Sequence, residues 1–217
     1  EIIETIETEK ADLIGISSLF TPYFQEVIQT ATMIKQHFDI PIILGGSHVS
    51  AMPEQMLNYD CVDYIIRGEG EKPIVEFIKC WNKKGDLKTV PNLGYKKGGS
   101  ILFNPIQENY PFNHIPNPDF SDFDFSDYLY EKKPLAFITT SRSCVYKCSF
   151  CSVHTTFGKK YRKRDTESIF QEMLQRYKAG YRVFDFEDDD LTYNKKNMID
   201  LCQKLQSHFN PGDIKLL

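Results

Sequence analysis

The stretch "PLAFITTSRSCVYKCSFC", residues 134–151, joins an apolar run to three closely spaced cysteines. The apolar run predicts a buried strand, and Cys144, Cys148 and Cys151 follow it with the spacing C-x3-C-x2-C. Loops at the carboxyl ends of parallel strands are where β/α folds gather their ligands. The stretch therefore predicts a metal site carried on a β/α unit.

The spacing leaves three interpretations of the cysteines open. Three thiolates can hold three irons of a cubane cluster and leave the fourth iron for another ligand. A Cys3His zinc site is the second interpretation, because His154 stands three residues beyond Cys151. Unliganded core cysteines are the third, and the polar residues interleaved with the cysteines disfavour them. The spacing favours iron–sulfur over zinc, because zinc sites usually pair two separated knuckles.

The sequence after the cysteines continues the strand–helix alternation. It predicts strands at 134–141, 181–189 and 214–217 and helices at 165–180 and 194–209. This succession is typical of the start of a (β/α) barrel. We expect residues 134–217 to form the amino-terminal part of such a barrel.

The first part of the chain has a similar alternation. It predicts strands at 11–19, 40–46 and 62–70 and helices at 22–38, 52–59 and 72–81. An α/β, Rossmann-like, doubly wound parallel sheet is therefore expected over residues 1–82. Residues 83–133 break the alternation and predict a linker that contains a small hairpin around Gly98 and Gly99.

Composition limits the class of protein. The chain has 217 residues, of which 41% are hydrophobic and 26% charged, as in soluble globular proteins of one or two domains. The net charge of −4 gives no general attraction to nucleic acid, and the basic run "GKKYRKR", residues 158–164, is expected to be a solvated face. No apolar run is long enough for a membrane span, and no signal sequence is visible.

Six cysteines without a signal sequence favour a reducing, cytoplasmic location. Cys61, Cys80 and Cys202 are isolated from one another and are expected to be small buried residues. The chain begins without Met and ends at the opening of a strand. We therefore expect it to be a segment of a longer protein.

The run "CVYKCSFC", with an aromatic residue before its last cysteine, resembles the signature of the radical S-adenosylmethionine enzymes. The resemblance implies that Cys144, Cys148 and Cys151 ligate a 4Fe–4S cluster whose free iron binds S-adenosylmethionine. A reductant such as flavodoxin or ferredoxin would then drive cleavage to a 5′-deoxyadenosyl radical. Phe150 would lie against the adenine, and His154 would not be a ligand.

The run "DFEDDDLT", residues 185–192, ends the second predicted barrel strand. Acidic runs are usually solvated loops, and a divalent-cation site is a further alternative. The run is similar to the F-x-D-D-x-F-T variant of radical S-adenosylmethionine enzymes that carry a cobalamin domain, in place of their usual Gly-Gly-Glu. The resemblance implies that Glu187, Asp188 or Asp189 pairs with the ammonium group of S-adenosylmethionine.

Three glycine-containing turns, "GISSLF", "LGGSHVSAMPE" and "RGEGEKP", follow the predicted strands of the first part. Together they resemble the second half of a cobalamin-binding domain. The resemblance implies that the nucleotide tail of cobalamin is bordered by Ser17, Ser18, Gly45, Gly46, His48, Gly68, Glu69 and Gly70. The D-x-H-x-x-G motif that supplies histidine to cobalt is absent from this sequence, so His48 is not assigned to the metal. Three explanations stay open: the motif precedes residue 1, the protein binds cobalamin without it, or this domain no longer binds cobalamin.

The combined resemblance covers nearly the whole chain and implies a cobalamin-dependent radical S-adenosylmethionine enzyme. Such enzymes transfer a methyl group to an unactivated carbon of their substrate, or they cyclise the substrate. The substrate is a small molecule or a peptide that the sequence does not identify. A zinc-stabilised binding module without catalysis is the alternative from another class. The methylthiotransferase branch is a third option, but its additional amino-terminal cysteine set is absent here.

Overall fold

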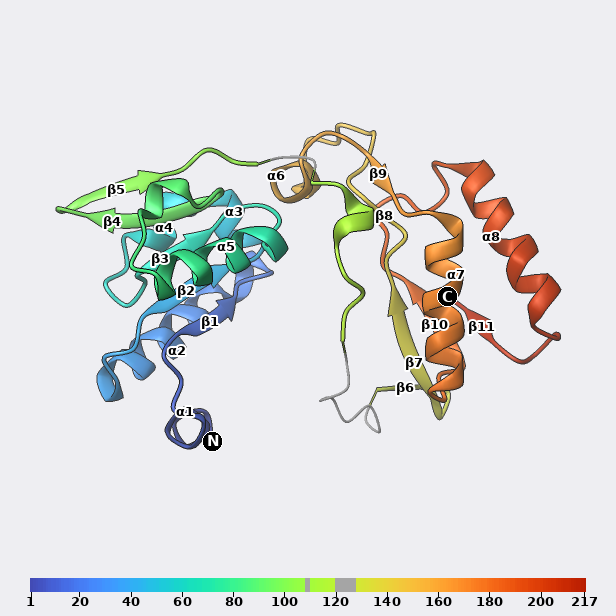
Figure 1. Cartoon of the computed structure of the whole chain (residues 1–217), viewed down its shortest axis with the longest axis horizontal. Helices are drawn as coiled ribbons and strands as arrows, with labels where there is room; N and C mark the ends of the chain where they lie inside the picture. The colour runs from blue at the N-terminus through green and yellow to red at the C-terminus, as the bar shows by residue number, and fades with distance from the viewer. Residues whose placement is uncertain (108–109, 120–127) are drawn as a thin grey trace. The chain divides into compact units, whose positions relative to one another are not determined.

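The structure is a computed structural model that describes residues 1–107, 110–119 and 128–217. It divides into two units (Figure 1). The first unit consists of Glu1–Glu108 together with Cys148–Gly158, and the second of Asn109–Lys147 together with Lys159–Leu217. Residues 108–109 and 120–127 of the expected linker lie outside the described residues.

The first unit is built on a sheet with the strand order β1-β2-β3-β4-β5. Its strands are β1 (Ile14–Ser17), β2 (Ile42–Gly45), β3 (Tyr64–Ile66), β4 (Leu93–Lys97) and β5 (Ser100–Phe103). The first three run parallel, while β4 and β5 continue the sheet as an antiparallel hairpin. This hairpin turns at Gly98 and Gly99, both with positive φ, as the sequence predicts.

Helices cover both faces of this sheet, because successive residues of a strand point to opposite sides. Ile42 and Leu44 pack with Ala31 and Ile34 of one helix, whereas Ile43 packs with Phe77 of another. The prediction of a doubly wound sheet is confirmed. The helices of the unit are α1 (Ile2–Glu9), α2 (Phe24–His37), α3 (Ser47–Ala51), α4 (Pro53–Leu57), α5 (Glu71–Asn82) and α6 (Val153–Phe157), with short 3-10 turns η1 (Thr21–Tyr23) and η2 (Leu87–Thr89).

The second unit contains a sheet with the strand order β11-β10-β7-β6. Its elements are η3 (Phe112–His114), β6 (Leu129–Tyr130), β7 (Lys133–Ile138), α7 (Thr166–Lys178), β10 (Val183–Phe186), α8 (Lys195–His208) and β11 (Lys215–Leu216), with a two-stranded ribbon of β8 (Ser141–Arg142) and β9 (Arg162–Lys163). Strands β7, β10 and β11 are parallel. This is the β/α succession expected for the start of a barrel.

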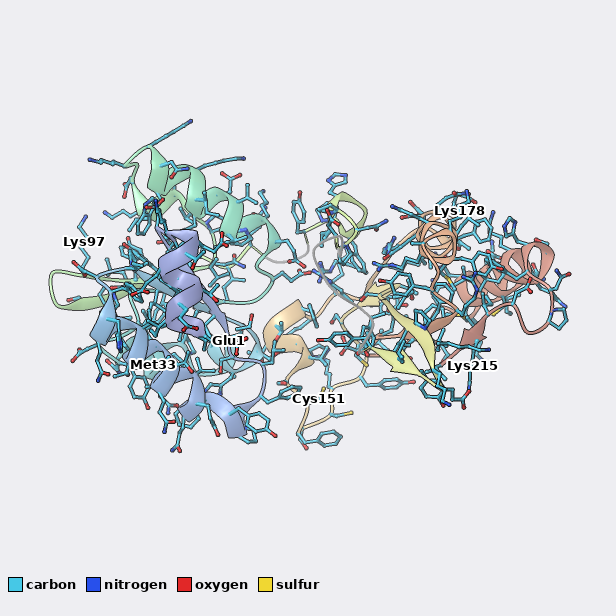
Figure 2. All side chains as sticks on the ribbon, turned by 90° about the horizontal axis from the view of Figure 1, so that it is seen from below. Glu1, Met33, Lys97, Cys151, Lys178 and Lys215 are labelled. Atoms are coloured by element: carbon cyan, nitrogen blue, oxygen red, sulfur yellow. The ribbon has the colours of Figure 1, made fainter. Side chains whose placement is uncertain are left out.

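The helices α7 and α8 lie side by side against this sheet (Figure 1). Ile138 of β7 and Phe184 of β10 are fully buried and share a cluster with Met173 of α7 and Leu201 of α8. At the amino ends of the strands, Nζ of Lys215 (labelled in Figure 2) pairs with the carboxylate of Glu131, the N–O distance being 3.0 Å. No helix among the described residues is both long and apolar enough to cross a bilayer.

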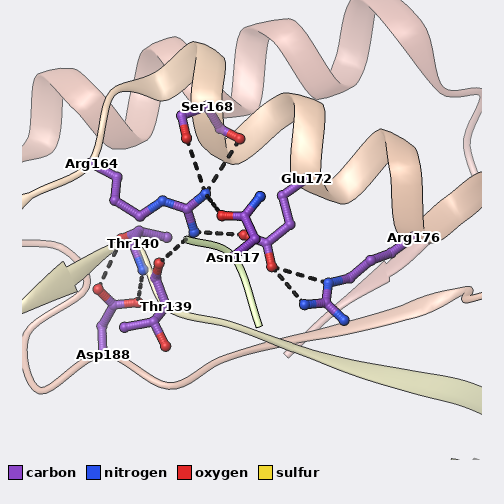
Figure 3. A network of polar contacts seen from close by, with 8 residues as sticks. All are labelled: Asn117, Thr139, Thr140, Arg164, Ser168, Glu172, Arg176 and Asp188. Atoms are coloured by element: carbon purple, nitrogen blue, oxygen red, sulfur yellow. Dashed lines mark hydrogen bonds and ion pairs between the residues drawn. The ribbon is translucent and has the colours of Figure 1, made fainter. Parts of the chain in front are cut away.

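Helix α7 carries a buried charge network (Figure 3). The Glu172 carboxylate accepts hydrogen bonds from Arg164 (2.6 Å) and from Nε and Nη2 of Arg176 (3.1 and 2.7 Å), and all three side chains are buried. Arg164 also donates to the side chains of Asn117 and Ser168 and to the carbonyl of Thr139. The network therefore connects helix α7 both to the segment before β6 and to the end of β7.

The expectation of a solvated face at residues 158–164 is wrong for part of the run. Arg164 belongs to the buried network, and Arg162 is also buried and donates to the carbonyl of Tyr110 at 2.9 Å. Arg162 and Lys163 form β9, which pairs with β8. Two arginines of the run therefore stabilise the fold, because buried guanidinium groups require partners.

The substitution Glu172→Gln should strongly destabilise the second unit. It leaves two buried guanidinium groups without a carboxylate, and removing one member of a buried ion pair costs about 3–5 kcal/mol. Urea denaturation followed by circular dichroism measures the change.

Glu167→Gln on the same helix is the matched control, because Glu167 pairs with Lys204 on the exposed surface. Solvent screens such a pair, so the control should unfold at nearly the midpoint of the wild type. Equal midpoints for the two variants would contradict the role given to Glu172.

Candidate functional site

A cavity of about 610 Å³ lies at the carboxyl ends of β1, β2 and β3. Open α/β sheets bind ligands at this end of their strands. The lining includes six of the eight residues predicted to border a cobalamin tail, namely Ser17, Gly45, Gly46, Gly68, Glu69 and Gly70. The three glycine turns are thus brought together around one cavity.

Gly46 allows the turns after β1 and β2 to meet. Its φ is +102°, and a Cβ atom at this position would lie 2.6 Å from the carbonyl oxygen of Ser18. Ser18 donates its backbone N–H to Gly45 (2.8 Å), and its carbonyl accepts from the backbone N–H of His48 (3.0 Å). Only glycine fits this position, because any side chain would collide with the Ser18 carbonyl.

Ser18 and His48, the other two predicted residues, are buried and are not among the lining residues of the described chain. The His48 ring packs on Phe24 with ring centroids 5.1 Å apart, and Nδ1 lies 3.2 Å from Oγ1 of Thr21. Burial lowers the pKa of His48, which keeps the ring neutral. His48 Nε2 and Ser18 Oγ are buried without a hydrogen-bond partner in the described part of the chain.

Two residues that the sequence analysis did not select hold the turns in place. Ser50 Oγ donates to the carbonyl of Gly46 (2.9 Å) and accepts from the backbone N–H of Gly68 (2.8 Å), so it connects two of the turns. Asn92, buried and with φ of +64°, donates to the carbonyl of Arg67 (2.8 Å). Ser50 lies inside a quoted motif, whereas nothing in the local sequence marks Asn92.

The chemistry of the cavity is mostly apolar. Leu19, Ile43, Ile66 and Ile74 contribute to its lining, and its charged groups in the described chain are the carboxylates of Glu69 and Glu71. The absence of Lys and Arg from this lining disfavours a polyphosphate nucleotide, whose charge requires cations or many N–H donors. A Cβ atom at Gly45 would meet no atom within 4 Å, so the strand end is open to a ligand. These properties suit a flat, largely apolar ligand with hydroxyl groups.

The predicted cluster cysteines follow β8. Cys144 is half-buried, whereas Cys148 and Cys151 are exposed (Cys151 is labelled in Figure 2). The backbone N–H of Cys151 donates to the carbonyl of Cys148 at 3.1 Å, which forms a tight turn before α6. Ser143, directly before Cys144, is fully buried with φ of +69°.

Within the described residues, no group of three or more His, Cys, Asp and Glu side chains is arranged to hold a metal ion. The Cys3His zinc hypothesis therefore gains no support from the geometry. Cluster ligation by the three cysteines stays a prediction that their spacing carries. Phe150, predicted to lie against adenine, is 91% exposed.

The acidic residues after β10 have different roles. The Asp188 carboxylate accepts from the backbone N–H of Thr140 (3.1 Å), from Thr140 Oγ1 (2.9 Å) and from Ser141 Oγ, and both partners are buried. Asp188, two residues after β10, thus holds Thr140, which lies two residues after β7 and four residues before Cys144. Of the three carboxylates predicted to bind S-adenosylmethionine, Asp188 is committed to the fold, while Glu187 and Asp189 are exposed.

Asp190 and Tyr161 also belong to this strand end, and the sequence analysis selected neither. Cys144 Sγ lies 4.0 Å from Oδ2 of Asp190. Burial, with Asp188 and Asp190 nearby, raises the pKa of Tyr161, while a hydrogen bond with Ser141 opposes this shift. Tyr161 is therefore a neutral group at ordinary pH.

The substitution Gly46→Ala should destabilise the first unit by more than about 2 kcal/mol, since a left-handed φ costs a non-glycine residue ~1–2 kcal/mol and the new methyl group would also meet the Ser18 carbonyl. Chemical denaturation measures this loss. Gly45→Ala is the control, because its methyl group meets no atom within 4 Å. A Gly46→Ala protein as stable as the control would refute the close-approach argument.

The substitution Asp188→Asn should loosen the end of β7. It replaces one acceptor oxygen by an NH2 group, which cannot accept from the Thr140 N–H, and a buried donor without a partner costs about 1–3 kcal/mol. Hydrogen exchange at the Thr140 amide should become faster by about tenfold or more. Glu187→Gln changes an exposed neighbour and should leave that rate unchanged; similar rates in both variants would contradict the assignment.

Comparison with known proteins agrees with this geometry. Residues 1–78 match the family model of the B12 binding domain. The chain is 28% identical over 211 residues to an uncharacterized methyltransferase of Pyrococcus horikoshii, covering 95% of this chain and 46% of that protein. It is 26% identical over 216 residues to the anaerobic magnesium-protoporphyrin IX monomethyl ester cyclase of Rubrivivax gelatinosus, covering 94% and 38%. The chain thus spans less than half the length of these curated relatives.

Among solved structures, the fold is similar to that of TsrM from Kitasatospora setae, a radical S-adenosylmethionine methyltransferase determined with cobalamin and a 4Fe–4S cluster bound. The TM-score is 0.74 at 19% identity, over 94% of this chain and 43% of that chain. At this identity the likeness concerns the fold. Residues 1–78 thus match the B12 binding domain, and the chain as a whole has the fold of a radical S-adenosylmethionine methyltransferase that binds cobalamin.

Proposed function

We propose that this chain provides the cobalamin site and the cluster site of a cobalamin-dependent radical S-adenosylmethionine enzyme. The reaction is methyl transfer to an unactivated carbon or cyclisation of such a substrate. One observation carries the proposal: an apolar, glycine-lined cavity lies in a B12-binding domain, and C-x3-C-x2-C follows the first parallel strand of the β/α succession. Relatives named as a methyltransferase and a cyclase support both outcomes.

The first unit would hold cobalamin through its cavity. Gly45 leaves the end of β2 open, and the apolar lining suits the flat base of a nucleotide tail. Ser17 and the carboxylate of Glu69 supply polar groups for the sugar hydroxyls. Residues 1–217 contain no D-x-H-x-x-G motif, and His48 is not assigned to cobalt.

The second site is the cysteine segment. Cys144, Cys148 and Cys151 would ligate three irons and leave the fourth for S-adenosylmethionine. When bound, the cluster supplies the electron that cleaves S-adenosylmethionine. The exposed cysteines Cys148 and Cys151 are accessible to cluster assembly, and Asp188 fixes the strand end before Cys144.

The acidic run would anchor the cosubstrate. The exposed carboxylates of the run, Glu187 and Asp189, are the proposed partners of the ammonium group of S-adenosylmethionine. A carboxylate–ammonium pair is a charge-assisted hydrogen bond and fixes the orientation of the methionine moiety. Electrons come from an external reductant such as flavodoxin or ferredoxin.

Anaerobic reconstitution with iron and sulfide tests the cluster. The wild-type chain should become brown and hold about four irons and four sulfides, as a cubane requires. Cys148→Ala should lose most of this iron, because two thiolates hold a cubane poorly. Cys202→Ala is the control. The expectation that Cys202 is buried was wrong: it is an exposed cysteine outside the segment, and its loss should change nothing.

His154→Ala separates the cluster from the zinc alternative. A 4Fe–4S site held by three cysteines keeps its iron in this variant, whereas a Cys3His zinc site loses a ligand. A colourless wild-type protein with one zinc ion, released by His154→Ala, would overturn the proposed function.

A further inference from the structure

Helix α6 begins two residues after the third cysteine, yet it belongs to the first unit. It packs against α3, which follows the glycine turn after β2. Thr156 and Phe157 of α6 line the same cavity as the glycine turns. A segment far along the chain therefore completes the wall of a cavity that the first strands begin.

The contact between α6 and the turn after β3 is close. A Cβ atom at Gly68 would lie 3.3 Å from the carbonyl oxygen of Thr156, and Gly68 has φ of +73°. The backbone N–H of Gly68 is held by Ser50, so the position of this turn is fixed. Glycine at residue 68 lets the backbone of α6 reach the mouth of the cavity.

Thr156 has a polar group that the fold does not use. Its Oγ1 atom is buried and has no hydrogen-bond partner within the described residues. Buried hydroxyl groups are normally hydrogen-bonded, and an exception calls for an explanation. Threonine in a helix has two accessible rotamers, so a modest rotation can direct the hydroxyl into the cavity that the residue lines.

We propose that α6 is a ligand-binding wall of the cobalamin site, with Thr156 forming a hydrogen bond to the bound cobalamin. The inference rests on the proposed function of the cavity. Cobalamin binding at α6 would also affect the cysteine segment, because α6 is continuous with the residues that include Cys148 and Cys151. Cobalamin binding stabilises this segment, and by thermodynamic reciprocity an ordered segment raises the affinity for cobalamin.

The test measures binding of hydroxocobalamin to the full chain by equilibrium dialysis. Thr156→Val keeps the shape of the side chain and removes its hydroxyl, so it should raise the Kd about tenfold, the value of one hydrogen bond. Thr155→Val is the matched control: Thr155 is the exposed neighbour on the same helix and is not among the lining residues of the described chain. Its Kd should stay within about twofold of the wild type, and circular dichroism should show both variants folded.

Hydrogen exchange gives a readout that is independent of the hydroxyl. On addition of hydroxocobalamin, amides 153–158 should exchange more slowly, while amides of α8 in the second unit should not change. The inference would be overturned, with the proposed function intact, by any of three results. Thr156→Val could bind with wild-type affinity, Thr155→Val could lose as much affinity as Thr156→Val, or exchange at amides 153–158 could stay unchanged. A wild-type chain that does not bind hydroxocobalamin would overturn the proposed cobalamin site itself.

Discussion

The backbone of Gly46 lies against the carbonyl of Ser18, and the architecture of the first unit depends on this approach. It brings the turn after β2 onto the turn after β1, where Ser18 bonds to Gly45 and His48 on either side. Ser50 extends the connection to the turn after β3. The cavity is the space that these turns enclose, so its shape follows from a contact that a single methyl group would prevent.

Carboxylates have the corresponding role in the second unit. Glu172 neutralises two buried arginines that hold α7, while Asp188 accepts three hydrogen bonds at the ends of β7 and β10. Both acids are surrounded by donors, which offsets the cost of removing charge from water. Glu187 and Asp189, on either side of Asp188, are exposed. Adjacent residues of one acidic motif can therefore have different roles, one stabilising the fold and its neighbours remaining available to a ligand.

The alternation of apolar runs and amphipathic segments predicted the parallel strands of both sheets and the helices α2, α5, α7 and α8. It did not predict α1 or β6, and it assigned the hairpin of β4 and β5 to the linker, although this hairpin extends the first sheet. It also placed Gly45, Gly46 and Gly68 at one end of a sheet, because parallel strands share their carboxyl edge. The short elements α3, α6, β8 and β9 were missed, since two to five residues carry no periodic signal. The roles of Asn92 and Arg164 were missed because they depend on contacts between distant segments.

The first unit is discontinuous in sequence, because Cys148–Gly158 returns to it from within the second. A chain ended at residue 108 would lack α6, and with it Thr156 and Phe157 from the cavity wall. A chain started at residue 109 would carry the cysteine segment without the surface on which α6 packs. A single cut in the chain therefore cannot yield both units complete, because part of the first unit lies within the sequence of the second.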